Sequence, residues 1–211
     1  MAYHGYIWTI GNYLQYIQKE KLEPIRVLEI GVYKGITTFS LINNLNCLGI
    51  KFIYDGIDIK IRNEVKITCQ YMLKHKGSEI NLIEDNSLNY LKNIKETYDV
   101  ILIDGDHNYE TVKSECELVK DLMHDNTLLI FDDYDGKWSN KDLYYSERDE
   151  YIDNEIATKR TNKFNKHGVK PAVDEFLENN RDTLFSFKIK PFEHSDPLCV
   201  IGRNNKIINP V

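Results

Sequence analysis

Residues 27–35 read VLEIGVYKG, an apolar run that leads into a turn containing Gly31 and Gly35. A strand that enters a glycine turn and opens a helix, here expected over residues 37–45, forms a ligand cleft at the carboxyl edge of doubly wound sheets, because small residues let a ligand approach the backbone. The spacing is G-x-x-x-G and not G-x-G-x-x-G, which disfavours a dinucleotide pyrophosphate. Glu29, at the end of the run, would repel a pyrophosphate and suits a positively charged ligand.

Similar apolar runs, rich in Ile, Val and Leu, recur along the chain and alternate with segments of helical spacing. Short continuous runs of this kind indicate strands that are buried on both faces, as in a parallel sheet covered by helices. The last two runs follow each other without a helix and predict an antiparallel hairpin. We therefore expect an α/β fold with a doubly wound, mostly parallel seven-stranded sheet. The expected strands are 25–30, 51–57, 80–83, 98–103, 127–131, 184–189 and 198–201, and the expected further helices are 65–74, 109–123 and 171–179.

The chain has 211 residues, the size of one domain, so we expect residues 1–211 to form a single domain. Residues 134–168 interrupt the alternation with a polar and aromatic stretch. Connections this long usually serve as lids or binding loops, and we predict a lid or substrate-binding insertion; a surface insertion with no role is the alternative. The apolar stretch 3–17 could cover a cofactor or pack against a partner, which leaves a homo-oligomer open.

Composition narrows the function classes. The net charge is −6, with 27 Lys and Arg against 33 Asp and Glu, and the basic residues are scattered, so we expect no nucleic-acid partner. No apolar run reaches the ~20 residues of a membrane helix, and the N-terminus lacks a basic region followed by an apolar stretch, so we expect neither a membrane partner nor a secretory signal. The 4 cysteines form no C-x-x-C pair, which fits a cytoplasmic protein.

Acidic residues follow several of the expected strands. Asp58 comes at the end of the second strand, where a carboxylate can accept hydrogen bonds from both hydroxyls of a ribose. Taken alone, Asp58 would read better as an ordinary turn residue. Its combination with Glu29 and the glycine turn favours the binding role.

The strongest signal lies in two later motifs, ILIDGDHNY at residues 101–109 and LLIFDDY at residues 128–134. Parallel strands end at the same edge, so we expect four carboxylates to converge there: Asp104, Asp106, Asp132 and Asp133. Such a group repels itself unless it is protonated or bridged by a cation, and oxygen ligands suit Mg²⁺, Mn²⁺ or Ca²⁺. Capping of the following helix or turn explains Asp104 or Asp106 taken singly, but not the Asp132–Asp133 pair.

The E-x-G-x-x-x-G motif with a second acid after the next strand resembles the class I S-adenosylmethionine-dependent methyltransferases. The resemblance runs from Ile25 to Arg203 and implies a Rossmann-like methyltransferase fold with S-adenosyl-L-methionine as the cofactor. Where the family often has G-D-S, Asp85 replaces the glycine and Asn86 the aspartate. The residues to which the resemblance assigns cofactor binding are Glu29, Gly31, Gly35, Asp58, Asn86, Ser87 and Asp104.

The D-G-D-H-x-Y and D-D-Y motifs are similar to those of the metal-dependent small-molecule O-methyltransferases, among them sugar O-methyltransferases. This resemblance implies that Asp104, Asp132 and Asp133 hold Mg²⁺ or another divalent cation such as Mn²⁺ or Ca²⁺. It implies that Asp106 is the catalytic general base. His107 is a second catalytic candidate, as a base or substrate donor, with a structural role in the loop as the alternative.

We therefore expect methyl transfer to a hydroxyl oxygen of a small-molecule acceptor, a sugar first and a catechol-like or other vicinal diol next. Trp138, Tyr144, Tyr145 and His167 of the 134–168 segment are weaker candidates for substrate contact. Three alternatives remain: a metal-independent methyltransferase, a nicotinamide oxidoreductase, which would need a phosphate-binding glycine pattern, and a non-catalytic S-adenosylmethionine-binding module.

Overall fold

The computed structural model describes residues 5–18, 23–189 and 198–203, and seven strands within them form one sheet. The strands are β1 (Ile25–Ile30), β2 (Phe52–Asp58), β3 (Glu79–Glu84), β4 (Tyr98–Ile103), β5 (Met123–Phe131), β6 (Phe185–Ile189) and β7 (Leu198–Gly202). The helices are α1 (Gly5–Gln18), α2 (Ile36–Cys47), α3 (Asn63–Met72), α4 (Ser87–Asn93), α5 (Tyr109–Val119) and α6 (Val169–Asn179), with short 3₁₀ turns at Lys120–Leu122 and Tyr145–Glu147.

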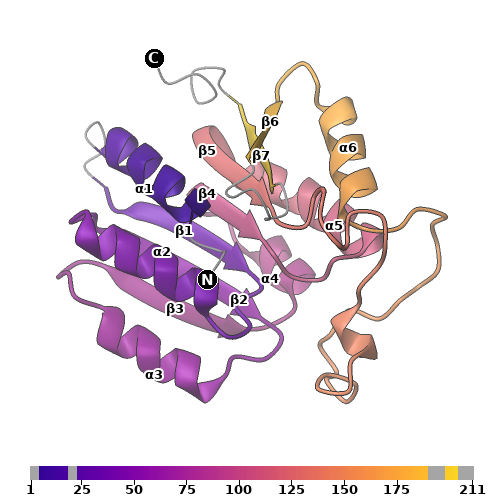
Figure 1. The fold of residues 1–211 in the computed structure, drawn as a ribbon, viewed down its shortest axis with the longest axis horizontal. Helices are drawn as coiled ribbons and strands as arrows, with labels where there is room; N and C mark the ends of the chain where they lie inside the picture. The colour runs from indigo at the N-terminus through magenta and orange to yellow at the C-terminus, as the bar shows by residue number, and fades with distance from the viewer. Residues whose placement is uncertain (1–4, 19–22, 190–197, 204–211) are drawn as a thin grey trace.

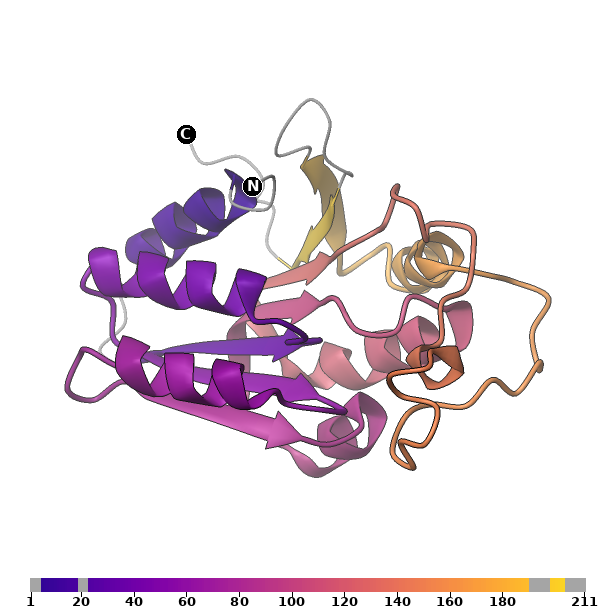
Figure 2. The same ribbon diagram turned by 60° about the horizontal axis from the view of Figure 1, so that its bottom comes forward.

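The strand order is β3-β2-β1-β4-β5-β7-β6 (Figure 1). Strands β1 to β5 pair in parallel, and β7 pairs antiparallel with both β5 and β6. The predicted doubly wound, mostly parallel sheet with a terminal antiparallel hairpin is thus confirmed. Because the parallel strands run the same way, their carboxyl ends meet at one edge of the sheet, as Figure 2 shows for β1 to β3.

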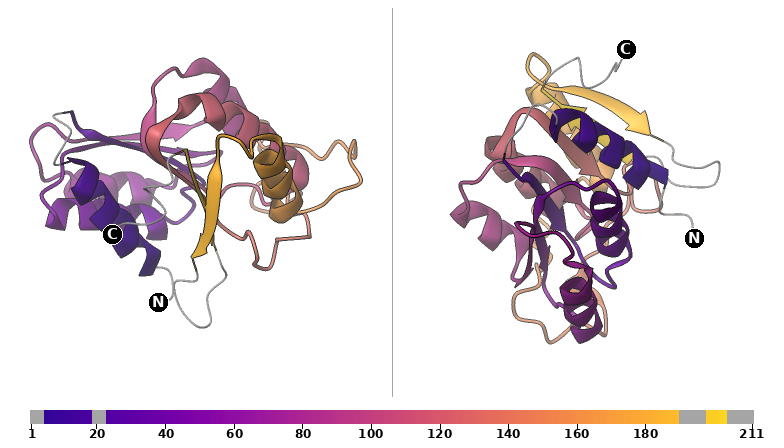
Figure 3. Two further views of the ribbon diagram at one scale, coloured as in Figure 1. Left: turned by 90° about the horizontal axis from the view of Figure 1, so that it is seen from above. Right: turned by 90° about the vertical axis from the view of Figure 1, so that its left-hand side faces the viewer.

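Two layers of helices bury the two faces of the sheet (Figure 3). Neighbouring residues of β1 divide between them: Val27 packs in a core with α1, α2 and α3, whereas Leu28 packs in a second core with α4, α5 and α6. Both faces of β1 are therefore apolar, which is why its sequence reads as a continuous hydrophobic run. Within the described residues, no helix has the length and apolar character to span a membrane.

Three local elements differ from the sequence-based expectation. The short helix α4 was not expected; the Asn86 side chain caps it by accepting from the Leu88 and Asn89 amides. The helix expected over 109–123 ends at Val119, and β5 begins as early as Met123. After the buried Met123, residues 124–126 of β5 are polar and partly or fully exposed, so this part of the strand carries no hydrophobic signal. In the 3–17 stretch, α1 packs on the core next to α2; positions 3 and 4 lie outside the described residues.

Residues 134–168, which we call the insertion, leave the end of β5, pass the carboxyl edge of the sheet and return at α6 (Figure 2). The Asp142 carboxyl ties the insertion together. It accepts from the Tyr109 and Gly168 amides at 3.2 and 2.8 Å and pairs with Arg160 at 3.0 Å and His167 at 2.7 Å. Although burial acts to raise it, the pKa of Asp142 is lowered, because His167 and the two amides donate to the carboxylate.

Replacing Asp142 by Ala should destabilise the protein by roughly 2 kcal/mol and loosen the insertion, because two amides and two side chains lose a shared acceptor. Denaturant unfolding and limited proteolysis within residues 134–168 measure the two effects. Asp149→Ala, an exposed position of the same segment, is the matched control and should change neither. Equal stability and equal cleavage of the two variants would contradict the role given to Asp142.

Candidate functional site

Two neighbouring cavities open at the carboxyl edge of the sheet. Residues that line the first cavity include Asp58, Asp85, Asn86, Ser87, Asp106, Tyr151 and Thr158. Residues that line the second cavity include Lys34, Ile36, Thr37, His107, Asp132 and Asp133. Gly31, Tyr33, Asp104 and Tyr145 line both. A molecule in one cavity would therefore meet a molecule in the other beside these four residues.

Gly31 brings the ends of β1 and β4 together. Its φ is +95°, and a Cβ atom at this position would lie 2.0 Å from the Asp104 carbonyl oxygen, so no larger residue fits. Tyr33, in the same turn, also has a left-handed backbone, as does Asp133, with φ of +46° and +54°. Non-glycine residues rarely adopt this conformation, and such strain concentrates at functional sites.

Glu29 and Gly35, which we predicted to bind the cofactor, are not among the described residues that line either cavity. Glu29 is 1% exposed and accepts hydrogen bonds from the Tyr54 hydroxyl and, at 2.9 Å, from Thr38 Oγ1. Burial raises the pKa of Glu29 to about 7. The structure thus places Glu29 behind the glycine turn, where it joins β1, β2 and α2, instead of on the cavity surface. Gly35 precedes α2 with φ of +75° and serves the turn itself.

Asp58 lies at the end of β2 and faces the first cavity. Its two carboxyl oxygens accept from the backbone amides of Tyr33 at 2.7 Å and Lys60 at 3.0 Å, which holds the side chain in one orientation. Burial nevertheless raises the pKa of Asp58 above its ordinary value. Asp58 thus presents an oriented carboxyl group to the first cavity.

Asn86 and Ser87 form the far wall of the first cavity, at the start of α4. Besides capping α4, Asn86 donates from Nδ2 to the Ile156 carbonyl at 2.8 Å and to Thr158 Oγ1 at 3.0 Å. These bonds fasten the insertion over the cavity. Ser87 Oγ donates to Glu115 Oε1 at 2.6 Å. The sequence analysis did not single out Glu115.

The four motif aspartates divide between the cavities. Asp104, Asp132 and Asp133 lie together at the second cavity, whereas Asp106 lines only the first, where it accepts from the Tyr145 amide at 2.8 Å. Burial raises the pKa of Asp106 to about 6. The expected general base is therefore separated from the Asp132–Asp133 pair, because the loop after β4 turns it toward the other cavity.

The acids at the second cavity repel one another and share one histidine. Burial, followed by the charge of Asp132 and a hydrogen bond to it, raises the pKa of Asp104 well above its ordinary value. His107 Nε2 lies 3.2 Å from Asp133 Oδ2 and 3.5 Å from Asp104 Oδ1. Burial lowers the pKa of His107 to about 4, so the imidazole is neutral at physiological pH.

Three carboxylates provide the hard oxygen donors that Mg²⁺, Mn²⁺ and Ca²⁺ prefer. They are not assembled as a finished metal site: the residues that the structure describes contain no group of three or more His, Cys, Asp and Glu side chains poised to hold an ion. Asp104 is instead hydrogen-bonded to Asp132, and His107 lies close to Asp104 and Asp133. The three carboxylates have the chemistry that a divalent cation requires, and all three lie at the second cavity.

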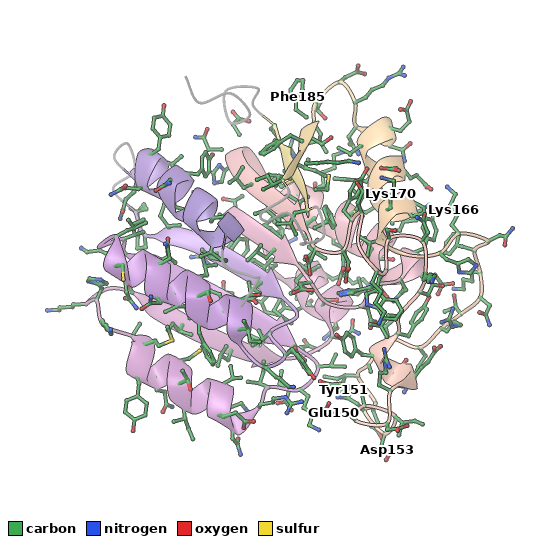
Figure 4. The ribbon with its side chains drawn as sticks, in the orientation of Figure 1. Glu150, Tyr151, Asp153, Lys166, Lys170 and Phe185 are labelled. Carbon is green, nitrogen blue, oxygen red and sulfur yellow. The ribbon has the colours of Figure 1, made fainter. Side chains whose placement is uncertain are left out.

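Aromatic residues that sequence reasoning ranked low or missed complete the walls. Tyr145 lines both cavities and packs edge-on against Tyr151, with ring centroids 5.4 Å apart. Arg62, before α3, lies 5.0 Å from the centre of the Tyr33 ring and pairs with Glu150 of the insertion. Figure 4 shows Glu150 and Tyr151 on the part of the insertion nearest to α3. In the sequence, the only signal for Tyr145, Glu150 and Tyr151 was that they belong to an aromatic-rich segment after the D-D-Y motif.

A family model described as a methyltransferase domain matches residues 28–134, half of the chain. The chain therefore belongs to this family of methyltransferase domains. The match runs from β1 to the residue after the Asp132–Asp133 pair, so it contains most of the residues that line the two cavities. No curated protein matches the chain in sequence.

Several solved structures share the fold at low identity. The SAH-bound methyltransferase PaMTH1 of Podospora anserina is 17% identical over 92% of this chain and 77% of its own, with a TM-score of 0.50. The O-methyltransferase from Bacillus cereus in complex with SAH is 17% identical over 93% and 81%, with a TM-score of 0.50. SAM-bound CalS10, an amino pentose methyltransferase from Micromonospora echinaspora, is 9% identical over 97% and 92%, with a TM-score of 0.52.

The raised pKa of Glu29 predicts a pH-dependent stability. Between its unfolded pKa and about 7, the folded state keeps a proton that the unfolded state has released, so stability falls as pH rises through this window. Glu29→Gln should reduce that slope by up to about 1 kcal/mol per pH unit. Denaturant unfolding at several pH values from about 5 to about 8 measures it. Parallel stability curves for the two proteins would contradict the buried, protonated Glu29.

Proposed function

We propose that this protein transfers the methyl group of S-adenosylmethionine to a hydroxyl oxygen of a small molecule, with a divalent cation at Asp104, Asp132 and Asp133. The observation that carries the proposal is the pair of cavities that meet at Gly31 and Asp104. One has the carboxylate expected for a ribose, and the other has the acids and the imidazole expected for activating a hydroxyl. Membership of a methyltransferase family supports the same reaction.

The first cavity suits a nucleoside with a cationic sulfur. Asp58, oriented by two amides, can accept from both ribose hydroxyls, and Gly31 lets the ligand lie against the backbone. Bound S-adenosylmethionine supplies an electrophilic methyl group on a positively charged sulfur. The described residues that line the first cavity include four acids, Asp104 among them, and no Lys or Arg, so its acidic charge would disfavour a pyrophosphate there. This charge supports a sulfonium cofactor over a nicotinamide dinucleotide.

The second cavity suits the acceptor hydroxyl. A divalent cation held by Asp104, Asp132 and Asp133 supplies Lewis acidity that lowers the pKa of a nearby hydroxyl. His107 lines this cavity beside Asp104 and Asp133, where its imidazole can contact an acceptor hydroxyl, although burial lowers its pKa and so weakens it as a base. Asp106 opens on the other cavity. Of the two predicted bases, His107 thus has the better position.

The insertion is proposed to act as a lid over the cofactor. Asn86 holds Ile156 and Thr158, and Asn154 Nδ2 donates to the Ile59 carbonyl at 2.8 Å, so the insertion is fastened on two sides of the first cavity. A sugar remains the proposed acceptor, because Tyr33 and Tyr145 offer ring surfaces beside the acids. CalS10, with its amino pentose substrate, shares the fold and is consistent with this choice.

Removal of divalent cations should abolish turnover, because the acceptor hydroxyl would keep its high pKa and the acids would repel one another. We expect a loss of at least about 100-fold after exhaustive chelation and recovery on adding Mg²⁺ or Mn²⁺. Activity is followed as S-adenosylhomocysteine release with a panel of sugars and vicinal diols, and cofactor binding by calorimetry. Undiminished turnover without metal would establish the metal-independent alternative instead.

The two cavities should respond to different substitutions. Asp132→Asn and Asp133→Asn should each lower kcat by at least about 100-fold and change the Kd of S-adenosylhomocysteine by less than about threefold. Asp58→Ala should weaken that binding by at least about tenfold, because the ribose loses a bidentate acceptor. Asp135→Asn is the matched control: this neighbour pairs with Lys170 and Lys188 and is not among the residues lining either cavity. An equal effect of all four variants on binding would contradict the division of roles.

A further inference from the structure

Glu115 of α5 is a buried acid with no part in the methyl transfer described above. It is 0% exposed and lies beneath the wall of the first cavity, where Oε1 accepts from Ser87 Oγ at 2.6 Å. Among the described residues, Oε2 has no hydrogen-bonding partner. Burying an acid costs free energy unless the acid forms hydrogen bonds. Glu115 forms such a bond with Ser87, so we ask what this bond does for Ser87.

Ser87 occupies the place where the base of a bound nucleoside would lie. The strand ends follow one another along the edge in the order β1, β2, β3 and bring Gly31, Asp58 and the Asn86–Ser87 wall into line. With the ribose at Asp58, a base that extends away from Gly31 reaches Ser87. This step rests on the proposed function, because it takes the ligand to be the nucleoside of S-adenosylmethionine.

The other polar side chains near Ser87 in the first cavity already form hydrogen bonds within the protein. Asp85 accepts from the Asn86 amide and from Asn89 Nδ2, and Asn86 caps α4 while donating to the insertion. Thr158 accepts from Asn86 and bonds to Asp106. The Ser87 hydroxyl gives its hydrogen to Glu115, so it turns oxygen lone pairs, and no donor, toward the cavity.

We propose that Glu115 is a positioning residue that holds Ser87 as a pure hydrogen-bond acceptor and so selects a base carrying an exocyclic amine. Adenine presents an amino donor at its 6-position and gains a hydrogen bond. Hypoxanthine presents a carbonyl acceptor there and places two lone-pair groups face to face. A site built to pair with a donor rejects a ligand that lacks it more strongly than shape alone does.

The Ser87 hydroxyl keeps this orientation in two states of Glu115. An ionised carboxylate accepts through either oxygen, and a carboxylic acid with its proton on the unpartnered Oε2 still accepts through Oε1. Burial raises the pKa of Glu115 to about 8, which is consistent with the protonated form at neutral pH.

Calorimetric titration with S-adenosylhomocysteine and with S-inosylhomocysteine tests the proposal, because the two ligands differ in the base alone. Wild type should bind the adenosyl ligand at least about tenfold more tightly, and Glu115→Leu should reduce this preference to within about threefold by freeing the Ser87 hydrogen. Ser87→Ala should lose the preference equally. In the Ser87→Ala background, Glu115→Leu should cause no further change, since Glu115 acts through Ser87.

Cys116→Ala, at the neighbouring buried position of α5 that packs in the core, is the matched control and should keep the full preference. Glu115→Met is the second variant should Glu115→Leu not fold, as judged by thermal unfolding. Wild type that binds neither ligand would refute the proposed function. Wild type that binds both equally, or a Glu115 variant that folds and keeps the full preference, would overturn the role of Glu115 and leave the methyltransferase function standing.

Discussion

The backbone contact between the ends of β1 and β4 is the constraint on which both cavities depend. The Asp104 amide donates to the Ile30 carbonyl at 2.8 Å, and the absent side chain of Gly31 leaves room for the Asp104 carbonyl beside it. This approach sets the Asp104 carboxyl at the border between the cavities. A Cβ atom at residue 31 would force the strand ends apart and displace the acid that the two cavities share.

Charge then divides the site into two parts with different chemistry. In the first cavity, the acids are satisfied by the protein itself: Asp58 by two amides and Asp106 by Tyr145. In the second cavity, burial together with the charge of Asp132 and a hydrogen bond to it raises the pKa of Asp104. A repelling group of acids is stabilised by a cation, which supports the divalent ion proposed at the second cavity and leaves the first cavity for the proposed nucleoside.

Buried acids behind the cavity walls give this edge its shape. Glu29 links the glycine turn to β2 and α2 through Tyr54 and Thr38, and Glu115 orders Ser87 from the side of α5. Among the described residues, no arginine or lysine contributes to the pKa shift of either acid, and burial is the main cause that raises both pKa values. Both act by accepting hydrogen bonds from hydroxyl groups, which fixes the orientation of neighbouring groups without adding charge to the surface.

Sequence alone was enough for the sheet, because strands such as Val27–Ile30 alternate between two helix layers and so read as unbroken apolar runs. It also located the glycine turn and the acidic strand ends, since residues that follow parallel strands must share one edge. It could not determine that Asp106 faces away from Asp132, that Glu29 lies behind the turn, or that Glu115 reaches Ser87. Those facts depend on loop conformation and on helix packing between residues distant in the chain, and only the tertiary structure decided them.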